Sequence, residues 1–179
     1  MDIRLDEVCL ASAVVVGVAG AIFDLRPSHR IPNWLTYGAV LCGLALRAAL
    51  GGWREFLSAL AAVVVMFFFT NTLYKLNSMG GGDVKLMTSI AAFAAMPHVF
   101  MEIFCIAIAG GVIAVGVIAW KGQLRKRVAS SLLLVAHHFH GGLTTHPELN
   151  LDNPDALKMP YGPAIALGSF AVLMISRGL

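Results

Sequence analysis

Six apolar segments, separated by short breaks, fill most of this chain of 179 residues. They cover residues 8–23, 31–50, 56–74, 84–96, 99–120 and 161–175. Several of them reach the length of about 20 residues that a helix needs to cross a bilayer. Only 13% of the residues are charged and 58% are hydrophobic, which excludes an ordinary soluble domain of this length. We therefore predict an all-α, polytopic membrane bundle of about six transmembrane helices, built as a single domain over residues 1–179.

The basic residues are divided unequally between the two ends of these segments. The breaks on the side of Asp24 and Asp83 carry nine of them: Arg26, Arg30, Lys75, Lys85, Lys121, Arg125, Lys126, Arg127 and Lys158. The opposite side carries four: Arg4, Arg47, Arg54 and Arg177. Since basic residues are enriched in cytoplasmic loops, the side with the two aspartates is predicted to face the cytoplasm.

Residues 121–159 form the longest polar stretch and are predicted to be a cytoplasmic loop. Within it, residues 124–139 place their apolar side chains on one helical face behind a basic start, which predicts a helix lying in the membrane interface.

The sequence predicts no metal site and no cofactor. The three cysteines are isolated and form no C-x-x-C pair, so they are interpreted as packing residues. Four histidines lie close together in sequence, but three of them fall within four residues, a spacing rarely arranged around one metal ion. They are His137, His138, His140 and His146.

A carboxylate follows a run of three glycines at the start of the fourth apolar segment, in the order Gly80, Gly81, Gly82, Asp83. An acid at the mouth of a membrane-spanning segment is costly to keep and is therefore a functional hypothesis. The segment after it, 84–96, would span only about 20 Å of a hydrocarbon core about 30 Å thick. Either its flanks extend it, or Asp83 lies below the membrane surface beside a wet cavity, which we favour. The simpler alternative is a loop acid stabilised by a helix dipole.

A second acid, Asp24, ends the first apolar segment. The second and third segments leave that side and return to it, so Asp24 and Asp83 are expected on the same side at similar depth. Two carboxylates in a partly dry site do not both ionise cheaply, and such a pair holds one proton between them. That arrangement suits peptide hydrolysis, with an ionised base and a protonated acid. The alternative, two unrelated acids at helix ends, stays open.

Three stretches resemble the motifs of the type 4 prepilin peptidases, in the order found in that family. Residues 23–36 resemble its first motif, an aspartate followed by mostly polar residues and then Ile-Pro-Asn. Residues 80–86 resemble the G-x-G-D motif, which presenilin-type intramembrane proteases share. Residues 159–168 resemble the Pro-Tyr-Gly-Pro-Ala run before the family's last helix.

The resemblance implies an intramembrane aspartic endopeptidase with Asp24 and Asp83 as the catalytic pair. It implies cleavage of the leader of type IV prepilins or pseudopilins, on the cytoplasmic side of the inner membrane, after a glycine that precedes the substrate's hydrophobic helix. The partners expected are that substrate and the lipid bilayer, with no nucleic acid.

Longer members of the family carry an insertion with paired C-x-x-C zinc ligands and also methylate the new N-terminus, and this chain has no such pair. It resembles the short members that serve tight-adherence (Flp-type) pili. Methyltransferase activity and a requirement for S-adenosylmethionine are therefore not expected. The archaeal preflagellin peptidases, another short branch, stay open.

Several residues near the motifs are predicted to support substrate binding: Gly80, Gly81, Gly82, Lys85, Pro160, Tyr161, Gly162 and Pro163. Each has a structural alternative. Lys85 would be an anchor at the membrane interface, and the Pro-Tyr-Gly-Pro run would be the start of a helix. Asn33 is predicted to cap the second segment.

Two other classes of function remain compatible with the sequence. A proton-coupled transporter also uses intramembrane acids and broken helices, although its acids gather near the membrane midplane. A non-enzymatic platform for pilus assembly would need neither aspartate.

Overall fold

The computed structural model describes residues 3–26, 30–76, 78–120 and 161–178. In these ranges the chain forms four helices and no strand: α1 (Ile3–Asp24), α2 (Asn33–Lys75), α3 (Gly81–Trp120) and α5 (Gly162–Ser176). The helices α1, α2 and α3 are long and apolar enough to cross a membrane, and α5 is a shorter apolar helix. The all-α class is confirmed for the described part of the chain, while six crossings stay a prediction. The predicted loop 121–159, with its interfacial helix, lies outside the described residues.

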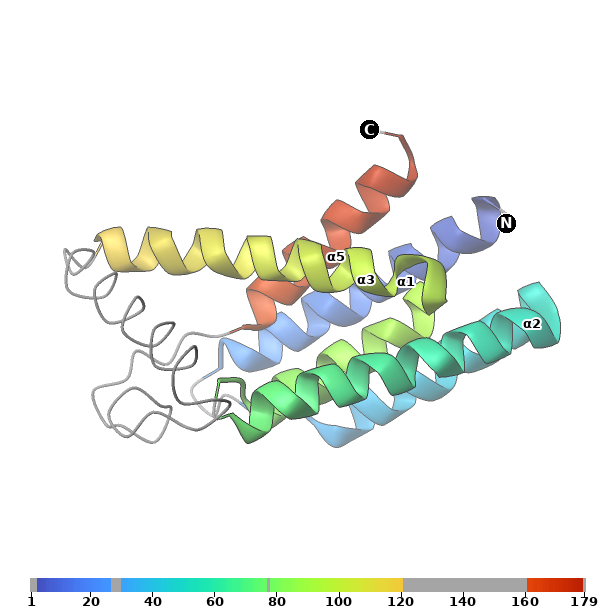
Figure 1. The fold of residues 1–179 in the computed structure, drawn as a ribbon, viewed down its shortest axis with the longest axis horizontal. Helices are drawn as coiled ribbons and strands as arrows, with labels where there is room; N and C mark the ends of the chain where they lie inside the picture. Colours follow the sequence, from blue (N-terminus) through green and yellow to red (C-terminus); the bar gives the residue numbers. More distant parts are fainter. Residues whose placement is uncertain (1–2, 27–29, 77, 121–160, 179) are drawn as a thin grey trace, which may run out of the picture.

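The two longest helices are each interrupted near the middle, and Figure 1 shows both doubling back on themselves. The break in α2 is at Gly52, whose φ of 73° is a conformation that glycine adopts without steric cost. The break in α3 is at Ala95, with a φ of 56°. The sequence places this second break two residues later, at Pro97 and His98. Proline lacks an N–H and its ring clashes with the carbonyl four residues earlier, that of Phe93, so the helix is interrupted between Phe93 and Pro97.

The six apolar segments of the sequence therefore correspond to α1, the two halves of α2, the two halves of α3, and α5. Figure 1 shows these pieces lying roughly along one direction, with the breaks of α2 and α3 at one end of the bundle. The C-terminus of α1 and the N-termini of α2, α3 and α5 gather at the other end.

The break in α3 is held by the guanidinium of Arg47. Pro97 has no N–H to donate to the carbonyl of Phe93, its partner in a regular helix. Arg47 donates to that oxygen instead, from Nε at 3.0 Å and from Nη2 at 2.6 Å. Nη2 also donates to the carbonyl of Ala94 at 3.3 Å. A side chain of α2 thus satisfies the carbonyls that the interrupted helix leaves open.

The same guanidinium pairs with two carboxylates, and we call Asp6, Arg47 and Glu55 the arginine cluster. Nη1 of Arg47 lies 2.8 Å from Oδ1 of Asp6 and 2.8 Å from Oε2 of Glu55. Because Asp6 belongs to α1 and Glu55 to the second half of α2, the cluster joins α1 to both halves of α2, and Arg47 links them to α3 through the Phe93 carbonyl.

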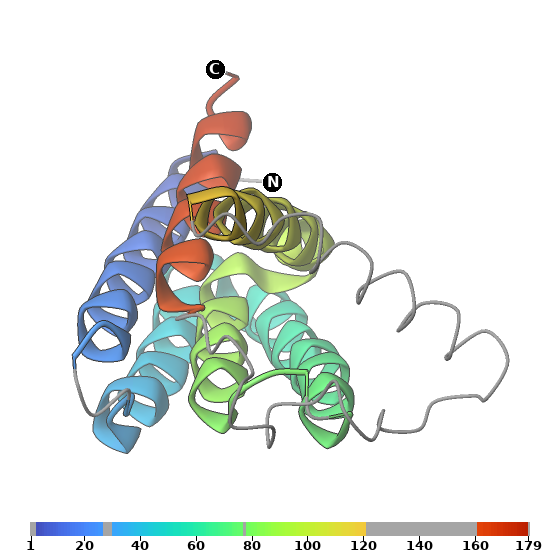
Figure 2. The same cartoon turned by 90° about the vertical axis from the view of Figure 1, so that its left-hand side faces the viewer.

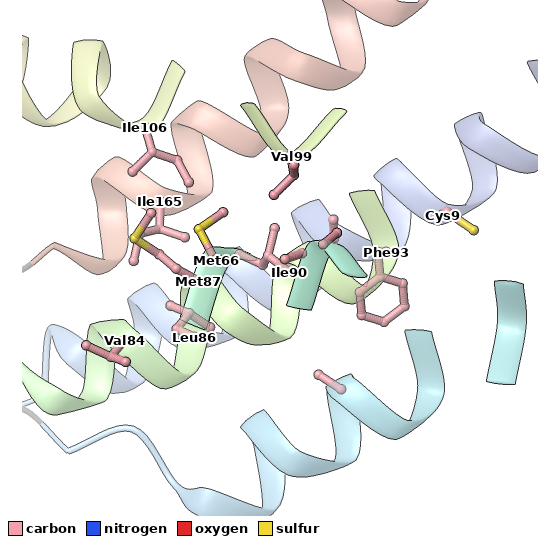
Figure 3. Close-up of a cluster of buried hydrophobic side chains, with 14 of the residues drawn as sticks. Cys9, Met66, Val84, Leu86, Met87, Ile90, Phe93, Val99, Ile106 and Ile165 are labelled. Atoms are coloured by element: carbon pink, nitrogen blue, oxygen red, sulfur yellow. The ribbon is translucent and has the colours of Figure 1, made fainter. Parts of the chain in front are cut away.

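The first half of α3 runs through the middle of the hydrophobic core. Figure 3 shows its side chains, among them Leu86, Ile90 and Phe93, packed with Met66 of α2 and Ile165 of α5. All five side chains are essentially buried. The first half of α3 is therefore fixed by packing on several sides, which positions Asp83 in its first turn.

Candidate active site

Asp24 and Asp83 lie at the end of the bundle opposite the arginine cluster. Asp24 is the last residue of α1, and Asp83 lies in the first turn of α3. The start of α5 reaches the same place, as Figures 1 and 2 show from two directions. Both side chains are buried, with exposed fractions of 7% and 9%. The structure therefore brings the two predicted acids to one end at similar depth, as the alternation of segments predicts.

The backbone of α5 holds Asp24 in place. The N–H of Gly162 donates to Oδ2 of Asp24 at 2.8 Å. A Cβ at position 162 would lie 2.7 Å from Cα of Ala21 and 2.9 Å from Cβ of Asp24, so only glycine allows this approach. The first N–H groups of a helix have no partner within it and lie at its positive end. The start of α5 therefore stabilises negative charge on Asp24.

Asp83 is close enough to Asp24 for their negative charges to repel each other. Its own N–H donates to the carbonyl of Gly80 at 3.1 Å, which closes a tight turn into α3. A Cβ at Gly80 would lie 3.0 Å from Oδ2 of Asp83, so the glycine leaves room for the carboxylate. The Tyr161 hydroxyl also interacts electrostatically with Asp83. Two acids and one tyrosine, from three helix ends, thus share one neighbourhood.

The three glycines before Asp83 do not form an extended loop. Gly81 and Gly82 are the first residues of α3, and only Gly80 precedes the helix. A Cβ would lie 3.6 Å from the Tyr74 ring at Gly81 and 3.5 Å from Ile31 at Gly82. These two residues therefore lengthen the short fourth segment at its start, as the alternative of extension by its flanks predicts. A position of Asp83 below the membrane surface, beside a wet cavity, stays a prediction.

Lys85 and Asn33 contact each other across two helices. Nζ of Lys85 donates to Oδ1 of Asn33 at 2.9 Å. The prediction that Asn33 caps α2 is wrong, because Pro32 occupies the cap position and no side chain caps this helix. Asn33 is the first residue of α2, and its amide faces α3 instead. This hydrogen bond ties the starts of α2 and α3 together beside Asp83.

The Pro-Tyr-Gly-Pro run starts α5. Tyr161 is its N-cap residue, and Pro163 lies in its first turn, where a missing N–H costs nothing. The helix-start alternative is therefore confirmed. A Cβ at Gly110 would lie 3.6 Å from the Tyr161 ring, so this ring packs against α3. Pro160 lies outside the described residues, and substrate binding by the run stays a prediction.

Two features of the interior were missed at the level of sequence. One is the donation from Gly162 to Asp24, for which the only signal was a glycine beside a predicted helix start. The other is Glu102, which is fully buried and accepts a hydrogen bond from Ser169 at 3.1 Å. Its Oε1 has no hydrogen-bond partner among the described residues. An acid inside an apolar segment was the available signal for this pair.

Metal binding finds no support in the geometry of the described ranges. No group of three or more His, Cys, Asp or Glu side chains in them is placed to hold an ion. The four clustered histidines of the sequence lie outside those ranges.

Comparison with known families gives one match. The model of the type IV leader peptidase family matches residues 11–115, more than half of the chain. The matched range contains both Asp24 and Asp83, whereas Tyr161 and Gly162 lie beyond it. Searches of curated proteins and of solved structures found no match.

Proposed function

Since this chain belongs to the type IV leader peptidase family, we propose that it is an intramembrane aspartic endopeptidase with Asp24 and Asp83 as its catalytic pair. The observation that carries the proposal is the meeting of two buried, mutually repelling carboxylates from α1 and α3. Two acids buried side by side do not both ionise without opposing folding, so a functional reason for the pair is the better explanation.

The pair would hydrolyse a peptide bond by general acid–base catalysis. The ionised carboxylate takes a proton from water, whose oxygen attacks the scissile carbonyl carbon. The protonated carboxyl gives its proton to the carbonyl oxygen, which yields a tetrahedral diol. The base then returns its proton to the amide nitrogen while the second carboxylate regains one from the diol. The C–N bond breaks and leaves a carboxylic acid and a new amino terminus.

The surroundings of the two acids support different roles for them. The N–H of Gly162 and the positive end of α5 favour negative charge on Asp24. We therefore assign the base to Asp24 and the acid to Asp83, with one proton shared by the pair.

The substrate class proposed is the leader of type IV prepilins or pseudopilins, of the Flp type. Support for this branch comes from the sequence, which contains no C-x-x-C pair. In this account the chain crosses the inner membrane six times, and the acid end faces the cytoplasm, as the basic residues predict. Methylation of the new amino terminus is not expected.

The test is cleavage of an Flp-type prepilin in membranes, with wild type, Asp24→Asn and Asp83→Asn. Asparagine keeps the shape of the side chain but cannot carry the proton. Each variant is expected to lose at least about a hundredfold in rate, the usual contribution of a general acid or base. Glu7→Gln is the control, because its carboxylate is an exposed partner of Arg177 at the other end of the bundle.

Either aspartate variant cleaving within tenfold of wild type, while accumulating normally, would remove that residue from the mechanism. Mass spectrometry of the mature product identifies the cleaved bond and shows whether its amino terminus carries a methyl group.

A separate experiment tests which side of the membrane the acid end faces. It uses a Cys42→Ala background, because Cys42 is an exposed cysteine that would itself be labelled. Leu25→Cys lies at the acid end and Trp53→Cys at the other, at positions that are 60% and 69% exposed. A membrane-impermeant maleimide is expected to label the cysteine at 25 only in inverted vesicles and the cysteine at 53 only in right-side-out ones. The reverse pattern would contradict a cytoplasmic site.

A further inference from the structure

A groove runs along the seam between α1 and the first half of α2, with a volume of about 410 Å³. Its walls are one face of each helix and its floor is Phe93 of α3. The lining residues are Ser12, Val15, Val16, Trp34, Leu35, Gly38, Ala39, Cys42 and Phe93. Nearly all of these are apolar, and they belong to helices long and apolar enough to cross a membrane. The groove is therefore a concave apolar surface within the membrane-spanning part of the bundle.

One end of the groove lies toward the acid end of the bundle, although neither acid lines it. Trp34 lines the groove and packs edge-on against the Phe23 ring, with centroids 6.1 Å apart. Phe23 directly precedes Asp24 in α1. From Trp34 the groove follows α2 to Cys42, which is about 12 Å of helix at 1.5 Å per residue. A chain bound at the two acids could thus continue along the seam without leaving the protein surface.

The middle of the groove is empty because of a glycine. A Cβ at Gly38 would meet no atom within 4 Å, and the residue is exposed. A side chain placed there would project into the groove without a clash. Most of a bundle's apolar surface is convex and faces lipid. This seam is instead concave, has an open position at Gly38, and ends at Trp34, which contacts the residue before Asp24.

We propose that this groove binds the apolar helix of the substrate that follows the cleavage point. The inference rests on the proposed peptidase function and adds where the substrate lies. The leader would remain on the polar side, the scissile bond would lie at Asp24 and Asp83, and the following segment would run along α1 and α2. An apolar lining at membrane depth selects an apolar segment, because a polar one would leave its groups unsatisfied there.

The first test fills the groove with Gly38→Leu. Cleavage of a prepilin with an intact apolar helix is expected to slow by about tenfold, mainly through a higher KM, because the leucine occupies the volume of the substrate's side chains. The matched control is Gly111→Leu in α3, another exposed glycine whose Cβ would meet nothing within 4 Å. Its cleavage rate is expected to stay within twofold of wild type. Equal rates for the two variants would overturn the proposal.

The second test does not depend on how well the glycine variants fold. Cys42 lines the groove and is exposed, whereas Cys9 and Cys105 are buried. In Asp83→Asn, which would keep the substrate uncleaved, single cysteines are placed along the substrate's apolar helix and oxidised in membranes. A disulfide to Cys42 is expected from one helical face only, and Cys42→Ala should abolish it.

The outcomes separate this proposal from the function on which it rests. The aspartate variants could lose cleavage while Gly38→Leu cleaves at the wild-type rate and no disulfide forms to Cys42. That result would mean that lipid alone fills the groove, and it would leave the proposed peptidase function intact. No cleavage by wild type of any prepilin would remove the function itself. Disulfides from every face of the substrate helix would indicate random collision and would also contradict binding in the groove.

Discussion

The buried carboxylates at the two ends of this bundle lie in opposite electrostatic surroundings. At one end, Asp6 and Glu55 each lie 2.8 Å from Nη1 of Arg47, so negative charge meets positive charge. At the other end, Asp24 and Asp83 lie close enough for two negative charges to repel each other. The two ends share α1, which carries Asp6 near its start and Asp24 at its last residue, about 27 Å apart along the helix.

This difference separates a structural role from a chemical one. In the arginine cluster, Arg47 donates hydrogen bonds to the carbonyls that the break in α3 leaves open, and it pairs with carboxylates of α1 and α2. A buried network of hydrogen-bonded charges can hold helices together in this way. Full ionisation of the acid pair would oppose folding, and the two acids are held together by the packing of α3 and the start of α5. Groups kept where they are not most stable are typical of catalytic sites.

The largest effect on stability is expected for Arg47→Met, which removes the cation of the arginine cluster. This change leaves the Asp6 carboxylate buried without its cation and leaves the Phe93 carbonyl without its donor. We expect the free energy of unfolding to fall by about 3–5 kcal/mol. Thermal unfolding in detergent measures this.

An exposed ion pair provides the control for the arginine variant. Arg177 pairs with Glu7 at 2.8 Å, but both side chains are about 40% exposed. Arg177→Met is expected to cost about 1 kcal/mol or less, because exposed pairs contribute little. If the two arginine variants unfolded at the same temperature, the cluster would not be the structural centre described above.

The next effect in size belongs to Gly162→Ala. The added Cβ would lie within 3 Å of Ala21 and Asp24, so α5 must move away and the N–H bond to Asp24 must lengthen. We expect about 1–3 kcal/mol of destabilisation, together with a cleavage rate that falls by more than tenfold. Gly116→Ala, at a position with nothing within 4 Å, should leave both unchanged. Normal cleavage by the alanine variant at 162 would separate α5 from the mechanism.

The smallest effect is expected for Lys85→Gln. Its hydrogen bond to Asn33 is exposed, so the change should cost about 1 kcal/mol or less and alter the cleavage rate by roughly threefold at most. A loss as large as that of an aspartate variant would show that Lys85 acts on the substrate or on the pair.

Apolar periodicity and breaks predicted much of this architecture. Asp24 ends α1, and Gly52, which interrupts α2, falls in the break between the predicted segments 31–50 and 56–74. These features depend on local properties, namely hydrophobic length, proline and glycine. Because successive apolar segments run in opposite directions, the same properties also predict that both acids lie at one end of the bundle.

The errors fall where a contact from another helix decides the outcome. The local sequence around Asn33 predicts a cap, but its side-chain oxygen instead accepts a hydrogen bond from Lys85 of α3. Gly81 and Gly82 look like a loop, but Tyr74 and Ile31 pack beside them and α3 starts there. The bond from Gly162 to Asp24 joins residues 138 positions apart, which no local pattern can indicate.

The central claim is that one end of the bundle is built for chemistry and the other for stability. It is tested most directly by measuring both cleavage rate and Tm for Asp83→Asn and Asp6→Asn. We predict that Asp83→Asn loses at least about a hundredfold in cleavage while its Tm stays the same or rises, since the amide, like the protonated carboxyl it replaces, places no negative charge beside Asp24. We predict that Asp6→Asn lowers Tm while its folded fraction cleaves normally. Cleavage by Asp83→Asn at a normal rate, or a Tm that falls as far as in Asp6→Asn, would contradict the account.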